Sequence, residues 1–128
     1  MTVNEEIILN HNLINWEVLE SVYDADEEVL TEIAEVFCEE APKSMEKIFL
    51  AISQSDRSDL KFYAHRMKGT LAAMGADSIS KSAYKLERMA HDENIETVKE
   101  LAGEISNDLS HLICFLRQPD WVSKINNK

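Results

Sequence analysis

The feature that most constrains the fold of this chain is a helical spacing of apolar residues that continues along nearly its whole length. The clearest stripe predicts a helix from about Asp59 to Met74, with apolar residues every three or four positions: Leu60, Ala64, Met67, Leu71 and Met74. Such a stripe covers one face of a helix and can be buried against other helices. Only three glycines and two prolines occur in 128 residues, too few for the frequent turns of an all-β chain.

The same spacing predicts four further helices, separated by polar segments such as 53–58. They lie over residues 15–23, 29–52, 79–90 and 98–116. Pro42 falls inside the second of these, where its missing N–H predicts a kink or a restart. Gly75 follows the 59–74 helix at the position where a glycine commonly ends a helix. Asp77 or Ser78 is expected to cap the next helix.

These elements predict an all-α fold, an up-and-down antiparallel four-helix bundle with a short additional N-terminal helix. We expect a partly ordered leader over 1–14, the bundle over 15–117 and a C-terminal tail over 118–128, with Trp121 a candidate to pack that tail against the bundle. The two cysteines, Cys38 and Cys114, fit no metal-binding spacing. We expect free thiols in a reducing compartment, with a disulfide as the alternative.

The charge balance limits the partners. Thirteen basic and 24 acidic residues give a formal net charge of -11. Nucleic acid is therefore an unfavourable partner, since binding phosphates needs concentrated positive charge, and an anionic membrane surface is unfavourable for the same reason. The sequence has no apolar run near the ~18 residues of a membrane helix and no secretory signal. We expect a monomeric, cytoplasmic protein without membrane insertion.

The candidate functional residues lie on the predicted 59–74 helix. His65 lies about 100° round the helix from the preceding apolar position, at the edge of the buried stripe or outside it. Lys61 and Lys68 share its face, and a histidine flanked by two lysines has little structural purpose. Glycine inside a helix costs about 1 kcal/mol relative to alanine. Gly69, extended by Ala72, therefore indicates a bare strip that a partner can approach.

This group of residues is suited to phosphoryl transfer. A neutral imidazole nitrogen is a competent nucleophile near pH 7. The reaction otherwise needs positioning and cations around the equatorial phosphoryl oxygens. Lys68 is placed for that role, and Lys61 or Arg66 could assist it.

The basic residues are concentrated around the same histidine. Residues 57–88 contain 7 basic and 3 acidic side chains, a net +4, whereas the rest of the chain has 6 basic and 21 acidic, a net -15. Such a basic hairpin on an acidic body would steer an acidic partner surface toward His65. We expect the docking surface to include Lys61, Arg66, Gly69, Ala72 and Lys85.

Residues 64–70 read Ala-His-Arg-Met-Lys-Gly-Thr, and residues 74–76 read Met-Gly-Ala. This pattern resembles the signature of histidine-containing phosphotransfer (HPt) domains, Ala-His-x-Leu-Lys-Gly-Ser followed by Leu-Gly-Ala. The two methionines and the threonine depart from it conservatively. The resemblance extends more weakly over 15–117, through Glu-Glu-Ala-Pro at 39–42 and Leu-Glu at 86–87.

The resemblance implies that His65 is phosphorylated, that Lys68 assists the phosphoryl group and that Gly69 leaves room for it. It implies a phosphocarrier without kinase activity of its own, without an ATP site and without a cofactor. Its partners would be receiver domains of response regulators or of a hybrid sensor kinase. One receiver would donate from its aspartyl phosphate and another would accept, each supplying the aspartate and the Mg²⁺. The initial methionine and the short length favour a free-standing protein over a module of a larger kinase.

Two alternatives stay open. In the first, the bundle binds a receiver or a sensor kinase without carrying phosphate, and the histidine is incidental. In the second, the bundle is a helical enzyme or a metal protein. Asp108 and His111 loosely resemble one Glu-x-x-His motif of di-iron bundles. Those sites need two such motifs and two further carboxylates, so we predict no metal site.

Overall fold

The computed structural model describes residues 13–91 and 94–126, and this part of the chain forms helices without strands. The helices are α2 (Trp16–Tyr23), α3 (Glu27–Ser53), α4 (Arg57–Ala73), α5 (Asp77–Met89), α6 (Ile95–Leu116) and α7 (Trp121–Asn126). The predicted all-α class is confirmed. None of the described helices is both long enough and apolar enough to cross a membrane.

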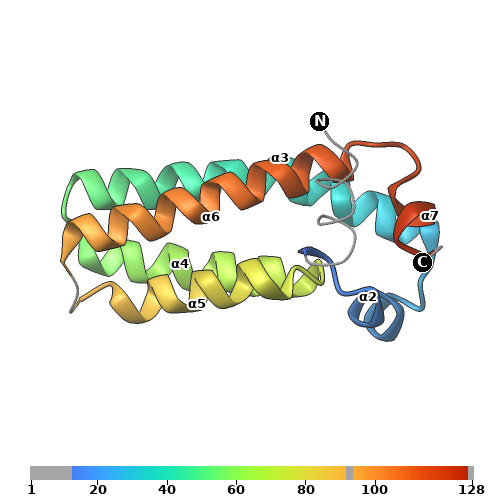
Figure 1. Cartoon of the computed structure of the whole chain (residues 1–128), viewed down its shortest axis with the longest axis horizontal. Coiled ribbons are helices and arrows are strands. Elements are labelled where there is room, and N and C mark those ends of the chain that lie inside the picture. Colours follow the sequence, from blue (N-terminus) through green and yellow to red (C-terminus); the bar gives the residue numbers. More distant parts are fainter. Residues whose placement is uncertain (1–12, 92–93, 127–128) are drawn as a thin grey trace.

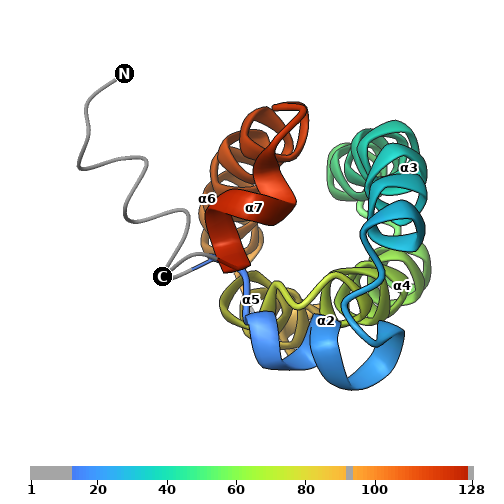
Figure 2. The same ribbon diagram turned by 90° about the vertical axis from the view of Figure 1, so that its right-hand side faces the viewer.

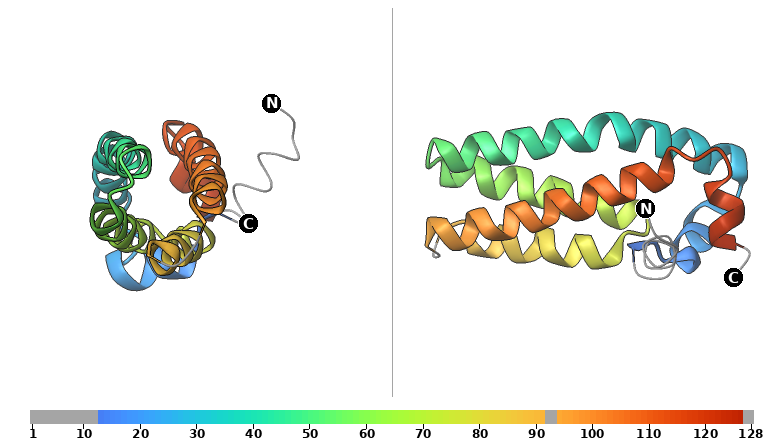
Figure 3. Two further views of the ribbon diagram at one scale, coloured as in Figure 1. Left: turned by 90° about the vertical axis from the view of Figure 1, so that its left-hand side faces the viewer. Right: turned by 45° about the horizontal axis from the view of Figure 1, so that its top comes forward.

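Four long helices, α3 to α6, form the body of the molecule. Consecutive helices lie side by side and run in opposite directions (Figure 1). In the end-on view, α4 and α5 form one side of the bundle, and α3 and α6 form the other (Figure 3). The short helices α2 and α7 lie together at one end, where α2 crosses the ends of α4 and α5 (Figure 2).

The core is built from the apolar stripes that the spacing predicts. On α4 and its C-cap, the five residues of the stripe are each no more than 1 % exposed. Leu86 from α5 and Ile105 from α6 are completely buried in the same core. Full burial of such a side chain contributes about 1.5–3 kcal/mol. The core therefore fixes the rotation of α4, and with it the direction in which its polar residues point.

The α3–α4 connection is shorter than the predicted 53–58 loop. Asp56 caps α4, because its side chain accepts a hydrogen bond from the Asp59 N–H at 2.9 Å. The helix consequently begins at Arg57, two residues before the predicted start. Only three residues, 54–56, separate the two helices, and Ser55 has a positive φ of 54° in this tight turn.

The long helix α3 continues through Pro42, so the expected restart is absent. Pro42 itself is exposed, while Ala41 and Met45 on either side of it are buried. A proline inside a helix costs about 3 kcal/mol or more. Burial of the neighbouring residues offsets this cost and keeps α3 in one piece.

The α4–α5 corner is held by Asn15, the N-cap residue of α2. Gly75 has a φ of +73°, and a Cβ at this position would lie 2.9 Å from the Asn15 carbonyl oxygen, so the glycine is required for both reasons. Its own carbonyl accepts a hydrogen bond from the Asn15 N–H at 2.7 Å. The predicted cap by Asp77 or Ser78 is wrong, since Ala76 occupies the cap position without a side-chain bond. Asp77 instead accepts from the Asn15 side chain at 2.9 Å.

The segment after residue 117, expected to be a tail, contains α7. Trp121 is 2 % exposed and makes an edge contact with Phe115, which confirms its expected packing. Six residues are too few for a helical stripe to be recognised in a sequence, so this helix was not predicted. Of the predicted leader, Leu13 and Ile14 are described and buried, and residues 1–12 lie outside the described part.

Both cysteines are free thiols, so the alternative of a disulfide between them is wrong. Cys38 is buried in α3, and Cys114 is exposed on α6. Burial raises the pKa of the Cys38 thiol, an effect that the positive charge of Arg117 partly offsets. A buried thiol of this kind behaves as a small apolar side chain.

Candidate functional site

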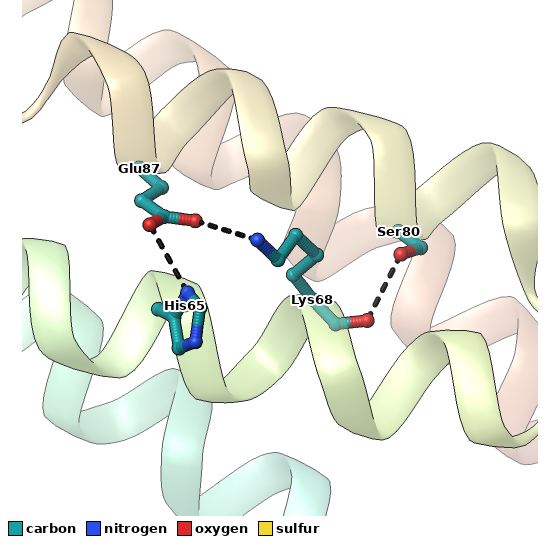
Figure 4. Close-up of polar contacts among 4 residues, drawn as sticks. All are labelled: His65, Lys68, Ser80 and Glu87. Carbon is teal, nitrogen blue, oxygen red and sulfur yellow. Dashed lines mark hydrogen bonds and ion pairs between the residues drawn. The ribbon is translucent and has the colours of Figure 1, made fainter.

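His65 lies on the outer face of α4, facing α5. Its side chain is 62 % exposed, which agrees with a position outside the buried stripe. The ring is nevertheless oriented, because Nδ1 lies 3.0 Å from Oε2 of Glu87 on α5 (Figure 4). An exposed histidine held in this way can present its other ring nitrogen in a fixed direction.

Lys68 lies one turn further along α4 and is directed toward the same carboxylate. Its Nζ is 3.1 Å from Oε1 of Glu87 and 4.9 Å from the centre of the Tyr84 ring. The side chain is 29 % exposed, so the ammonium is partly shielded by α5. Ser80 adds a bond between the two helices, since its hydroxyl donates to the Lys68 carbonyl at 2.9 Å.

Glu87 therefore lies between the two predicted site residues, with one oxygen on each. Its side chain is only 15 % exposed, and Oε1 has no described partner besides the Lys68 ammonium. Burial raises the pKa of the Glu87 carboxyl, but the hydrogen bonds and positive charges of Lys68 and His65 outweigh that effect. The net result is a lowered pKa. The carboxylate is thus ionised at neutral pH.

The contact with Glu87 decides which nitrogen of a neutral His65 ring is available. An ionised carboxylate only accepts hydrogen bonds, so Nδ1 must carry the proton and donate it. The lone pair is then on Nε2, which has no hydrogen-bond partner among the described residues. Of the two ring nitrogens, Nε2 is therefore the one whose lone pair is available for nucleophilic attack.

The surface beside the ring is bare. A Cβ built at Gly69 meets no other atom within 4 Å, and Gly69 and Ala72 are both exposed. This is the open strip that the sequence predicts beside His65. A partner can approach the imidazole here without displacing a side chain.

The other predicted docking residues take no part in the polar contacts of His65, Lys68 and Glu87. Lys61 and Arg66 on α4 and Lys85 on α5 are exposed, and no hydrogen bond or ion pair between described residues joins them to His65 or Glu87. The Arg66 guanidinium lies over the Phe62 ring at 5.8 Å. The structure thus brings His65 and Lys68 together and leaves these three cations as surface charges.

Sequence reasoning missed four residues of the site. Glu87 was counted only as a charge opposing the basic segment and as part of a weak family resemblance. Tyr84 and Phe62 are large exposed side chains, 47 % and 54 % respectively, and Arg88 lies over the Tyr84 ring at 5.8 Å. A signal was present, because Glu87 and Arg88 follow Tyr84 by three and by four residues, the two spacings at which helical side chains are neighbours.

Among the described residues, no group of three or more histidine, cysteine, aspartate or glutamate side chains is arranged to hold a metal ion. The loose motif formed by Asp108 and His111 therefore has no further ligands nearby in that part of the chain. Di-iron bundles need carboxylates and histidines from several helices.

Comparison with known proteins identifies a family for this chain. The family model of the Hpt domain matches residues 32–113, which include most of α3, all of α4 and α5, and most of α6. No curated protein and no solved structure matches the chain. The matched segment contains His65, Lys68 and Glu87 and spans more than half of the sequence, and the chain accordingly belongs to the Hpt domain family.

Proposed function

We propose that this protein is a phosphocarrier of a two-component phosphorelay, which accepts a phosphoryl group on His65 and passes it on. Membership in the Hpt family supports a role in two-component phosphotransfer. The observation that carries the proposal is the orientation of His65. Its Nδ1 lies 3.0 Å from Oε2 of Glu87, which leaves Nε2 as the unprotonated nitrogen, and the neighbouring position one turn along α4 is Gly69, which carries no side chain.

The transfer step follows from this arrangement. The Nε2 lone pair attacks the phosphorus of an aspartyl phosphate on a receiver domain. The P–N bond forms, the P–O bond breaks, and the electron pair remains on the aspartate carboxylate. Lys68 provides positive charge beside the transferring group, and the receiver supplies the Mg²⁺. Passing the group to a second receiver is the reverse of the same step.

The surface around His65 supports a protein as the partner. Phe62 on α4 and Tyr84 on α5 are exposed aromatic side chains, each with an arginine, Arg66 or Arg88, stacked over its ring. We refer to these four residues as the aromatic–arginine surface. Aromatic and arginine side chains are the types that dominate protein interfaces. Lys61 and Lys85 add the positive charge that would attract an acidic receiver surface.

The protein would act as a cytoplasmic monomer without kinase activity of its own. Incubation with ATP alone should then leave it unlabelled. The first experiment is transfer from a phosphorylated receiver, or from a sensor kinase with its receiver. The expected label is acid-labile and base-stable, and it is absent from His65→Gln.

Two other histidines provide matched controls, since His91 and His111 are exposed as His65 is. His91→Gln and His111→Gln should be labelled like the wild type. Labelling of His65→Gln would reject the assignment of the phosphorylated residue. Binding of a receiver without any label would favour a pure interaction module instead.

A further inference from the structure

A groove runs between α3 and α6, on the side of the bundle away from His65. Both end-on views show these two helices opposite the pair α4 and α5, which carries the candidate site (Figures 2 and 3). Two hollows, of about 450 Å³ and 250 Å³, follow one another along this α3–α6 seam. We refer to the two hollows together as the seam groove. None of its lining residues belongs to the surroundings of His65.

The α3 wall of the seam groove is acidic. Its exposed residues recur every three or four positions and so form one stripe along the helix: Thr31, Glu35, Glu39, Pro42, Glu46 and Phe49. None of the ion pairs between described residues includes one of these three glutamates. Like charges four residues apart on a helix destabilise it. The fold therefore does not explain the pair formed by Glu35 and Glu39.

The floor of the seam groove is apolar. Ala34 and Cys38 in the first hollow, and Met45 and Leu109 in the second, are each no more than 6 % exposed. Phe49, which is 40 % exposed, stands at the edge of the second hollow. An apolar floor beside an acidic wall fits a partner with one apolar face and one basic face.

The α6 wall is lower and carries little charge. Ser106 and Ser110 line the second hollow, and their short side chains allow a partner to lie close to the helix. Arg117, near α7, is the one cation among the described residues that line the groove. Three carboxylates against one guanidinium leave the lining with a net charge of -2.

We propose that the seam groove docks a basic amphipathic helix of another protein. The α3 wall between residues 31 and 49 is about 27 Å long, the length of a helix of about 18 residues. Both walls are helices whose backbone groups are already paired, so an extended peptide would find no backbone partners there. A helix can instead place apolar residues on the floor and lysine or arginine against the three carboxylates.

Charge also separates this partner from a receiver. Residues 57–88, around His65, have a net charge of +4, and the rest of the chain has -15. The seam groove would repel an acidic receiver surface, and the surroundings of His65 would repel a basic helix. Docking at the groove does not depend on the proposed function of His65. Simultaneous binding of a receiver on the opposite side does rest on it.

The test is an NMR titration with a synthetic helical peptide of about 18 residues, in which leucine recurs every three or four positions and lysine fills the rest. A control peptide has glutamate in place of each lysine. We expect the basic peptide to shift the amide signals of Glu39 and Ser110 and the indole signal of Trp121. The amide signals of His65 and Gly69 should stay in place. The acidic peptide should shift none of them.

A charge variant replaces the three groove glutamates with glutamine. It should bind the basic peptide about tenfold more weakly, because three charge pairs are lost, and added salt should have less effect on it. A matched control removes the same charge at three exposed positions that line neither hollow: Glu20→Gln, Glu100→Gln and Glu104→Gln. This control should bind the peptide like the wild type.

The apolar contact is tested by Phe49→Ala, which should weaken peptide binding about fivefold, the loss expected for an interface aromatic worth about 1 kcal/mol. Phe62→Ala is the matched control, since Phe62 is 54 % exposed on α4. It should leave peptide binding unchanged.

Three outcomes would overturn the proposal. Equal losses in the two triple variants would show that the peptide is attracted only by the overall acidic charge. Equal binding of the acidic peptide would show that the carboxylates select nothing. Signals along the groove that shift with protein concentration, without peptide, would make a second copy of the chain the occupant.

Failure of the proposed function is distinguishable from these outcomes. Phosphoramidate, a small phosphoryl donor that needs no docking, should label His65 equally in the wild type and in both triple variants. An unlabelled His65 would count against the phosphocarrier and would leave peptide binding at the seam groove as it is.

Discussion

The α4–α5 seam and the α3–α6 seam of this bundle are held together by different contacts. Across the first, Glu87 joins His65 and Lys68, and Ser80 donates to the Lys68 carbonyl. Across the second, no hydrogen bond or ion pair joins the described residues of the two helices, and the ion pairs there lie within one helix: Lys43–Glu40 and Lys99–Glu96. Polar bridges that solvent reaches on one side, as it reaches His65 here, add little stability. We therefore attribute their concentration on one seam to the candidate site rather than to the fold.

The two seams also differ in shape. Hollows of about 450 Å³ and 250 Å³ lie along the α3–α6 seam, the first reaching Trp121 and the second lined by Phe49 and Ile113. None of the residues that line them belongs to the surroundings of His65. The exposed ring on α4 instead lies on an open face, bordered by the bare position of Gly69. An open face suits a protein partner better than a small substrate, which binds in a concave site.

The largest expected effect tests whether both seams depend on one core. Met67 on α4 is 1 % exposed, and Ile105 on α6 is fully buried. Met67→Ala and Ile105→Ala should each lower the free energy of unfolding by about 2–5 kcal/mol, as usual when a large core side chain is removed. Urea denaturation measures the change. His65→Gln should stay within about 0.5 kcal/mol of the wild type, because the ring is exposed.

A smaller effect, on the rate of transfer, tests whether an exposed aromatic residue beside His65 takes part in docking a receiver. Phe62→Ala should slow transfer from a receiver about tenfold, the loss expected when an interface aromatic worth more than 1 kcal/mol is removed. Phe49→Ala is the matched control, since Phe49 is 40 % exposed on α3. It should leave transfer unchanged. Equal losses in the two variants would show that the aromatic–arginine surface has no special part in docking.

Two glycines within helices, one on each seam, have space for a side chain, so the same substitution can be compared on both seams. A Cβ at Gly69 on α4 or at Gly103 on α6 meets nothing within 4 Å. Gly69→Ala and Gly103→Ala should each therefore stabilise the bundle by about 0.5–1 kcal/mol, measured by thermal unfolding.

Only Gly69→Ala should slow transfer from a receiver, while its labelling by phosphoramidate stays normal. Slower transfer in Gly103→Ala would show that the α3–α6 seam also takes part in docking. Unchanged transfer in Gly69→Ala would show that a methyl group fits under the docked partner.

The sequence predicted the buried stripe of α4, because a stripe depends only on spacing along one helix. For the same reason it placed His65 and Lys68 on one exposed face, one turn apart. It could not place Glu87, which comes from α5 and depends on how the two helices are aligned. That alignment is set by the corner at Gly75, where Asn15 of a different segment binds.

The predicted helix boundaries were wrong for a related reason. Asp56 and Asp59 are both capable caps, and only the turn at Ser55 selects the first of them. Pro42 predicted a kink or a restart, and the restart is absent because α3 continues through it. The helix α7 was not predicted because six residues are too few to show a stripe, and its position depends on the packing of Trp121, Val122 and Ile125 into the core. For Pro42 and α7, packing against residues from outside the local segment decides the outcome.

The smallest expected effect is a pH dependence that belongs to the α4–α5 seam alone. The pKa of Glu87 is lowered in the folded protein by Lys68 and His65 despite its burial. An unfolded chain therefore binds a proton at this carboxyl more readily than the folded one. The resulting stabilisation is complete above the unfolded pKa of about 4.3 and is lost as the pH falls through the folded value.

Wild type and Glu87→Gln should accordingly differ in urea stability at pH 7, with the wild type more stable, and the difference should shrink as the pH is lowered below about 4. Glu40→Gln, which removes an exposed ion pair within α3, should show little difference at any pH, because Lys43 and Glu40 are mostly solvated. A gap between wild type and Glu87→Gln that persists unchanged at low pH would contradict the charge-based origin of the contact. The polar bridge would then act through shape, and the two seams would differ in packing rather than in electrostatics.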